Sequence, residues 1–117
     1  MGNKSYNLKK LDEIAQGNDD FIKDMVVTFV ENVTADINGI QSFKSVENWT
    51  AIAETAHKLA SNFAYLGATG LHALATDIEK SVLLEHNLTG IADKTDKLCH
   101  DGVLLIGQLK KDFFING

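Results

Sequence analysis

A histidine near the middle of the chain stands among unusually small side chains. His57 belongs to the stretch AHKLASNFAYLG, residues 56–67, whose apolar residues recur with helical spacing. On a helix, the row of residues around His57 holds only small side chains: Ala53, Ala60, Ser61 and Ala64. We therefore predict that the imidazole projects above the helix surface, where a second macromolecule can reach it. The plainer alternative is an ordinary surface histidine in an alanine-rich helix.

The same histidine also fits half of a metal site. Glu54 and His57 form a Glu-x-x-His pair, the motif that di-iron four-helix bundles use twice, together with two further glutamates. The sequence holds no second such pair. The other histidines, His72, His86 and His100, lack paired ligand spacing, so we expect them at the surface or at helix ends. We therefore predict no metal site in this chain.

Composition limits the classes of partner. The 117 residues include 11 basic and 16 acidic ones, which gives a net charge of −5, and no basic run occurs. Nucleic acid and anionic membrane surfaces are therefore not expected as partners. No apolar run approaches the roughly 20 residues that a membrane-spanning helix needs. The lone Cys99 fits a reducing compartment, so we expect a cytoplasmic protein. We also expect a monomer.

The chain contains no proline and reads as a succession of helices. Asn18 and Asn48 are predicted N-caps, with Asp19 and Asp20 at the favourable end of a helix dipole. Gly67 suits the position just past a helix end. The predicted helices cover about residues 7–15, 19–45, 49–66, 69–87 and 89–114.

Apolar residues recur every three or four positions in each long segment, which predicts one buried stripe per helix. The stripes are Ile22, Met25, Phe29, Val33, Ile37 and Ile40; then Ile52, Ala56, Leu59, Phe63 and Leu66; then Leu71, Leu74, Ile78 and Val82; and last Ile91, Leu98, Leu105, Leu109 and Phe113. Short links between such helices favour antiparallel neighbours. We predict an all-α fold over residues 1–117 as one domain: an antiparallel up-down-up-down four-helix bundle with a short amino-terminal helix across one end.

The stretch around His57 resembles the histidine-containing phosphotransfer (HPt) domain of two-component phosphorelays. That family has the pattern His-x-Leu-Lys-Gly, then small residues, then an apolar-Gly pair ten residues after the histidine. The matching positions here are His57, Leu59, Ser61, Leu66 and Gly67. The resemblance extends over nearly the whole chain, because the flanking segments GNDDFIKDMVVTFVENVTADI and GATGLHALATDIE are similar to the helices that surround the active histidine in that family.

The resemblance implies a chemistry for His57. A neutral imidazole nitrogen accepts a phosphoryl group from the aspartyl phosphate of a receiver domain and passes it to another receiver's aspartate. An unperturbed imidazole titrates near pH 6.5, roughly, so a neutral nucleophile is available at neutral pH. The implied partners are response-regulator receiver domains and a sensor or hybrid histidine kinase. The receiver supplies the Mg²⁺, and this chain binds no cofactor and is not itself an enzyme.

The resemblance also implies roles for two neighbours. A Glu or Gln 22 residues after the histidine accepts a hydrogen bond from its Nδ1–H in that family, and Glu79 holds this position. The alternative is that Glu79 is a solvated surface residue. Lys58 matches the basic residue commonly found just after the histidine and could steer the phosphoryl group electrostatically. Equally, Lys58 could pair only with Glu54 one turn earlier.

Two positions depart from the family pattern. Ser61 replaces the usual glycine but is small enough to let a receiver approach. Ala60 replaces the lysine thought to contact the phosphoryl group, so a phosphohistidine is electrostatically less favoured here. Lys58 points about 200° around the helix from Ala60 and is not assumed to compensate. This loss supports an alternative of another class, a non-phosphorylated adaptor that keeps the bundle and docks receivers.

Overall fold

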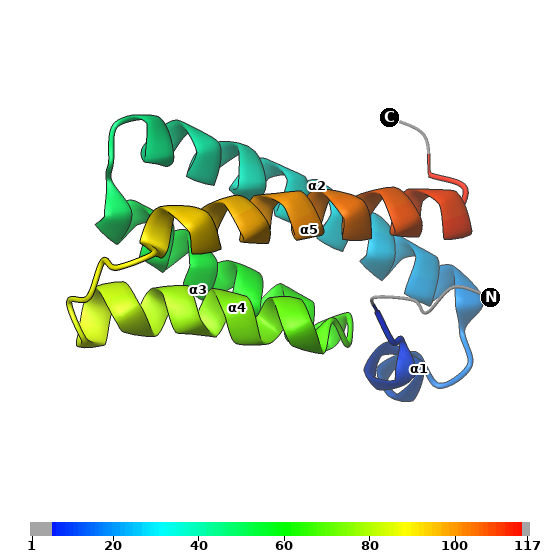
Figure 1. The fold of residues 1–117 in the computed structure, drawn as a ribbon. Coiled ribbons are helices and arrows are strands. Elements are labelled where there is room, and N and C mark those ends of the chain that lie inside the picture. The colour runs from blue at the N-terminus through cyan, green and yellow to red at the C-terminus, as the bar shows by residue number, and fades with distance from the viewer. Residues whose placement is uncertain (1–5, 116–117) are drawn as a thin grey trace.

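The computed structural model describes residues 6–115. All regular elements in this part of the chain are helical, as predicted (Figure 1). The predicted single domain also includes residues 1–5 and 116–117, which lie outside the described residues. The elements are α1 (Lys9–Ala15), α2 (Asp19–Ser45), α3 (Trp49–Tyr65), α4 (Thr69–Glu79), the π-helix η1 (Lys80–Leu84) and α5 (Ile91–Asp112).

Both predicted asparagine caps are confirmed. The side chain of Asn18 accepts a hydrogen bond from the backbone N–H of Phe21 at 3.0 Å, and that of Asn48 accepts one from Ala51 at 3.1 Å. Each bond satisfies an amide that the first helical turn leaves without a partner. These caps mark the first turns of α2 and α3, and the starting point of each helix sets which of the following residues share a face.

The four longer helices pack side by side in a bundle. α3 packs against α2 and α4, and α5 packs against the same two helices. Figure 1 shows the short connections at the ends of the bundle, with α1 lying across one end. The core of this bundle is apolar, and its largest fully buried side chains include Phe63, Ile40, Ile52, Leu59, Leu66, Ile78, Leu98, Leu105 and Leu109.

The buried stripe of α2 differs from the prediction over its first half. Ile22 is buried as predicted, but Val26 and Val30 are the next buried residues, whereas Met25 and Phe29 are only partly buried. α2 is covered by α3 on one side and by α5 on the other, so its buried face is wider than a single row of residues. On such a wide buried face, either of two adjacent rows of residues could lie at the centre, and the spacing of apolar residues does not show which row is the more deeply buried.

The third long helix is not α-helical throughout, which corrects the predicted span to residue 87. After Glu79 the chain continues as the π-helix η1, and the N–H of Glu85 donates to the carbonyl of Lys80 at 3.0 Å, five residues earlier. Val82 is nevertheless buried, as predicted. The last helix begins and ends within two residues of its predicted bounds.

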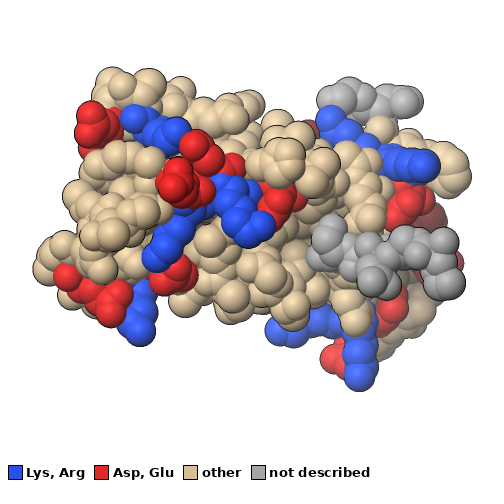
Figure 2. Space-filling view, in the orientation of Figure 1, with Lys and Arg blue, Asp and Glu red and all other residues tan. Residues whose placement is uncertain are grey.

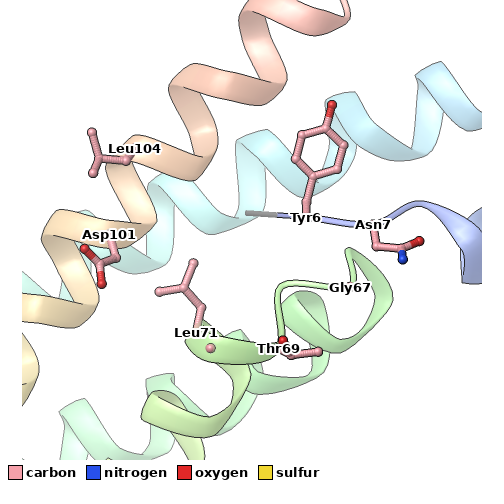
Figure 3. Close-up of a pocket in the computed structure, with 8 residues that line it drawn as sticks. Tyr6, Asn7, Gly67, Thr69, Leu71, Asp101 and Leu104 are labelled. Carbon is pink, nitrogen blue, oxygen red and sulfur yellow. The ribbon is translucent and has the colours of Figure 1, made fainter. Parts of the chain in front are cut away.

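The turn after α3 is closed by Gly67 and by the start of the chain. Gly67 has φ of +64°, and the N–H of Asn7 donates to the carbonyl of Leu66 at 2.8 Å. A Cβ atom on Gly67 would lie only 2.3 Å from the carbonyl oxygen of Asn7. Figure 3 shows Gly67 against Asn7, beside a hollow that Leu71, Asp101 and Leu104 also line. The turn therefore requires glycine both for its backbone conformation and for lack of space.

None of the helices within residues 6–115 is both long and apolar enough to cross a bilayer.

Candidate functional site

His57 lies in the middle of α3 with its side chain 67% exposed. Its Nδ1 atom is 2.8 Å from Oε2 of Glu79, the last residue of α4. A carboxylate can only accept, so this contact selects the tautomer in which Nδ1 carries the proton. The lone pair of Nε2 is then left for chemistry. The structure thus brings together the two residues that the sequence resemblance paired.

The close packing of α3 on α4 positions this pair. α3 packs extensively on α4, and both helices carry small buried residues, Ala53, Ala56 and Ala60 on α3 and Ala75 on α4. Because such side chains let two backbones approach closely, the side chain of Glu79 can reach a residue on the flank of the neighbouring helix. Glu79 follows the fully buried Ile78 and is itself 28% exposed, at the edge of the bundle.

The predicted row of accessible small residues is only partly correct. Ala53 is fully buried and Ala60 is 7% exposed, so neither offers a surface to a partner. Ser61 is exposed and Ala64 is half-buried. The physical reason is that α3 packs against α2, α4 and η1, which together leave little of its surface open. The open surface beside His57 lies instead on the flank toward α2.

An open hollow of about 500 Å³ occupies that flank. Its lining residues come from α2 and α3: Asn32, Ala35, Asp36, His57, Lys58, Ser61 and Asn62. All of these except Ala35 carry a polar group. The hollow therefore provides a polar surface next to the imidazole, while Glu79 is bonded to the ring from α4.

Lys58 pairs across the hollow rather than along its own helix. Its Nζ atom lies 3.3 Å from Oδ1 of Asp36 on α2. Among the described residues this is the ion pair formed by Lys58, so the predicted alternative pairing with Glu54 is not the one adopted. The side chain of Asp36 is 15% exposed and that of Lys58 is 66% exposed.

The sequence predicted no role in the site for Asp36, Asn32 or Asn62. Asn32 and Asp36 are four residues apart on α2 and so share a face, but nothing in the sequence states which face of α2 meets α3. The orientation of α2 about its own axis places Val26 and Val30 in the core. The same orientation places Asp36 within reach of Lys58.

The remaining candidates lie away from this site or take other partners. His72 is exposed, and its Nδ1 atom is 2.9 Å from the carbonyl oxygen of Ala60. His86 and His100 are exposed as well. No three potential metal-ligating side chains come together within the described part of the chain. Cys99 is buried, and burial, assisted by Asp96, raises the pKa of its thiol.

Charged side chains on the face formed by α4 and α5 are mixed in sign (Figure 2). Lys94 contacts Asp77 at 2.9 Å, and Lys97 contacts Asp101 at 2.7 Å. These two lysines are therefore paired with carboxylates and do not form a patch that would attract a polyanion.

Comparison with known proteins identifies the family. The sequence model of the Hpt domain matches residues 24–111 of the chain. No curated protein and no solved structure was found to match the chain. The resemblance drawn from the residues around His57 is thereby confirmed.

Proposed function

Because the chain belongs to the Hpt domain family, whose members carry phosphoryl groups in two-component signalling, we propose that His57 is its phosphoryl acceptor. The observation that carries this proposal is the exposed imidazole of His57 with its Nδ1 atom bonded to Glu79. In this role the chain is an intermediate in a phosphorelay. It takes the phosphoryl group from one receiver aspartate, or from a kinase, and delivers it to another receiver.

The transfer uses the Nε2 lone pair. Nε2 attacks the phosphorus of an aspartyl phosphate, the N–P bond forms, and the P–O bond to the receiver carboxylate breaks, so that the free carboxylate leaves. No proton has to be removed from Nε2, because Nδ1 carries it. The positive charge that develops on the ring is stabilised by the Glu79 carboxylate at 2.8 Å. Delivery to the next receiver is the reverse of these steps.

The remaining catalytic groups belong to the partner in this proposal. Phosphoryl transfer depends mainly on positioning and on neutralising charge, both of which a docked receiver with its own Mg²⁺ can supply. A single domain folded as an up-down-up-down bundle is sufficient to present His57 to a receiver. In this proposal the protein acts in the cytoplasm as a monomer. It needs no cofactor of its own. Lys58 adds positive charge beside His57, and Ser61 leaves room for the receiver.

A second candidate is a non-phosphorylated adaptor that docks receivers. The observation that favours it is Ala60, which is 7% exposed and brings no positive charge to the position where the family has lysine. An adaptor has no use for a tautomer-selecting carboxylate, however, and the bond between His57 and Glu79 is better accounted for by phosphoryl transfer.

A two-step relay assay separates these candidates. The chain is incubated with a phosphorylated receiver and Mg²⁺, purified, and then mixed with a second, unphosphorylated receiver. The relay predicts that label leaves the chain and appears on the second receiver. An adaptor predicts binding to both receivers with no label on the chain at any time.

A further inference from the structure

We propose that Asp36 tunes how strongly the phosphoryl group is held on His57, by neutralising Lys58 in the hollow beside it. This inference rests on the proposed function and extends it from the acceptor to the energetics of the phosphorylated site. Asp36 does not touch the reacting atoms in this proposal. It is a positioning residue that acts on the phosphoryl group through its own charge and through its ion pair with Lys58.

One basic and one acidic side chain line the hollow beside His57. Of the residues that line it, Lys58 is the basic one and Asp36 the acidic one, and His57 opens onto the same space. Nζ of Lys58 and Oδ1 of Asp36 are 3.3 Å apart, so the positive charge among the residues that line the hollow is already compensated. Lys58 has three N–H donors, of which Asp36 engages one, so two are left to donate to another acceptor.

The imidazole has a second carboxylate on its other side. Glu79 bonds Nδ1 from α4. The charged residues that contact His57 or line the hollow beside it are therefore Glu79 and Asp36, with one negative charge each, and Lys58, with one positive charge. A phosphoryl group adds up to two more negative charges to this setting. Ala60 offers none of the compensation that a lysine would bring.

The consequence is a site that passes the phosphoryl group on rather than storing it. Coulomb repulsion from Asp36 and the partial withdrawal of Lys58 both raise the free energy of the phosphohistidine relative to the receiver aspartyl phosphate. Removing the charge of Asp36 removes the repulsion and also frees Lys58. Both changes lower the free energy of the phosphohistidine, so the equilibrium should shift toward it. Because Lys58 is largely exposed, solvent screens the effect and keeps it moderate.

The test measures how label divides at equilibrium between His57 and a receiver. We expect Asp36→Asn to raise the ratio of phosphohistidine to aspartyl phosphate by about three- to tenfold, and Lys58→Gln to lower it by a similar factor. Asp36→Glu keeps the charge and should retain the wild-type ratio. The effect of Asp36→Asn should shrink as salt is raised from about 0.05 to 1 M, because the Debye length falls to about 3 Å.

Asp96→Asn is the matched control. Asp96 forms an ion pair with Lys44 that likewise joins α2 to another helix, here α5, away from the hollow. Its loss should leave the equilibrium ratio unchanged. A ratio that Asp36→Asn leaves unaltered or lowers, or an effect independent of salt, overturns the proposal.

A second measurement needs no receiver. Phosphoramidate, a small phosphoryl donor, is used to label His57, and the ³¹P signal is followed against pH. The pH at which the phosphoryl group takes up its proton should move down in Asp36→Asn and up in Lys58→Gln. If receivers fail to label the wild type, the proposed function fails, while this titration still decides the role of Asp36. Identical titration curves for wild type and Asp36→Asn contradict the inference.

Discussion

The Nδ1 atom of His57 lies 2.8 Å from Oε2 of Glu79, although the two residues sit on different helices and 22 positions apart. This contact turns an exposed imidazole into an oriented one. It keeps the proton on Nδ1, directs the Nε2 lone pair outward, and places a carboxylate where positive charge develops during phosphoryl transfer.

Removing the Glu79 carboxylate should therefore slow transfer without unfolding the bundle. For Glu79→Ala we expect a transfer rate about tenfold lower, in the range that loss of an orienting partner typically costs. Glu79→Gln keeps an acceptor for Nδ1–H and should recover part of the rate. Single-turnover transfer from a phosphorylated receiver measures both, and thermal melting checks the fold. Equal rates in wild type and Glu79→Ala remove Glu79 from the site.

A bulky side chain at Ser61 should block receiver docking. Ser61 is exposed and lines the hollow beside His57. A tyrosine at this position should therefore leave folding undisturbed, but its ring would block the approach of a receiver to the imidazole. We expect Ser61→Tyr to melt like the wild type and to bind a receiver at least about tenfold more weakly, by titration calorimetry. Val103→Tyr, at an exposed position of α5, is the control and should bind normally. An unchanged isotherm for Ser61→Tyr argues against docking on this flank.

The helices and their caps followed from the sequence because local rules determine them. Asn18 and Asn48 cap helices through bonds three residues away, and Gly67 adopts the left-handed conformation that glycine tolerates. The π-helix after Glu79 had no such local signal, since the apolar spacing from Ile78 to Val82 suits an α-helix equally well.

The site was only partly predictable, because its remaining contacts depend on how helices are rotated against one another. Glu79 was found through the family spacing from His57. Lys58 was assigned to Glu54 as a possible partner on the same helix, but it pairs with Asp36 on α2. Ala53 and Ala60 were expected at the surface, but both are buried because α3 packs against α2, α4 and η1.

Gly67→Ala should destabilise the fold markedly. The change places a Cβ atom against the backbone of Asn7 in a conformation with positive φ. We expect a loss of about 2–3 kcal/mol in the free energy of unfolding. Gly107→Ala is the matched control, because nothing lies within 4 Å of its added Cβ. Within α5 it should be neutral or stabilising by up to about 1 kcal/mol. Urea denaturation of both variants measures the difference, and equal stabilities contradict the packing described for Gly67.

Cys99 should react slowly while the protein is folded. Burial and Asp96 raise the pKa of the thiol, with Lys44 opposing them. The folded state thus keeps the proton at pH values where the unfolded chain begins to lose it. The stability linked to this group is full below the thiol pKa of the unfolded chain and falls as the pH rises above it. We expect iodoacetamide at pH 8 to alkylate Cys99 at least about tenfold more slowly in the native protein than in urea. Comparable rates would show that the thiol is accessible.

The central claim is that His57 carries the phosphoryl group, and the most direct measurement is the site and chemical lability of the label after incubation with a phosphorylated receiver and Mg²⁺. We expect acid-labile, base-stable phosphate on the wild type, mapped to His57 by mass spectrometry, and none on His57→Gln. Label that persists in His57→Gln, or a wild type that takes up no phosphate while it binds the receiver, contradicts the account.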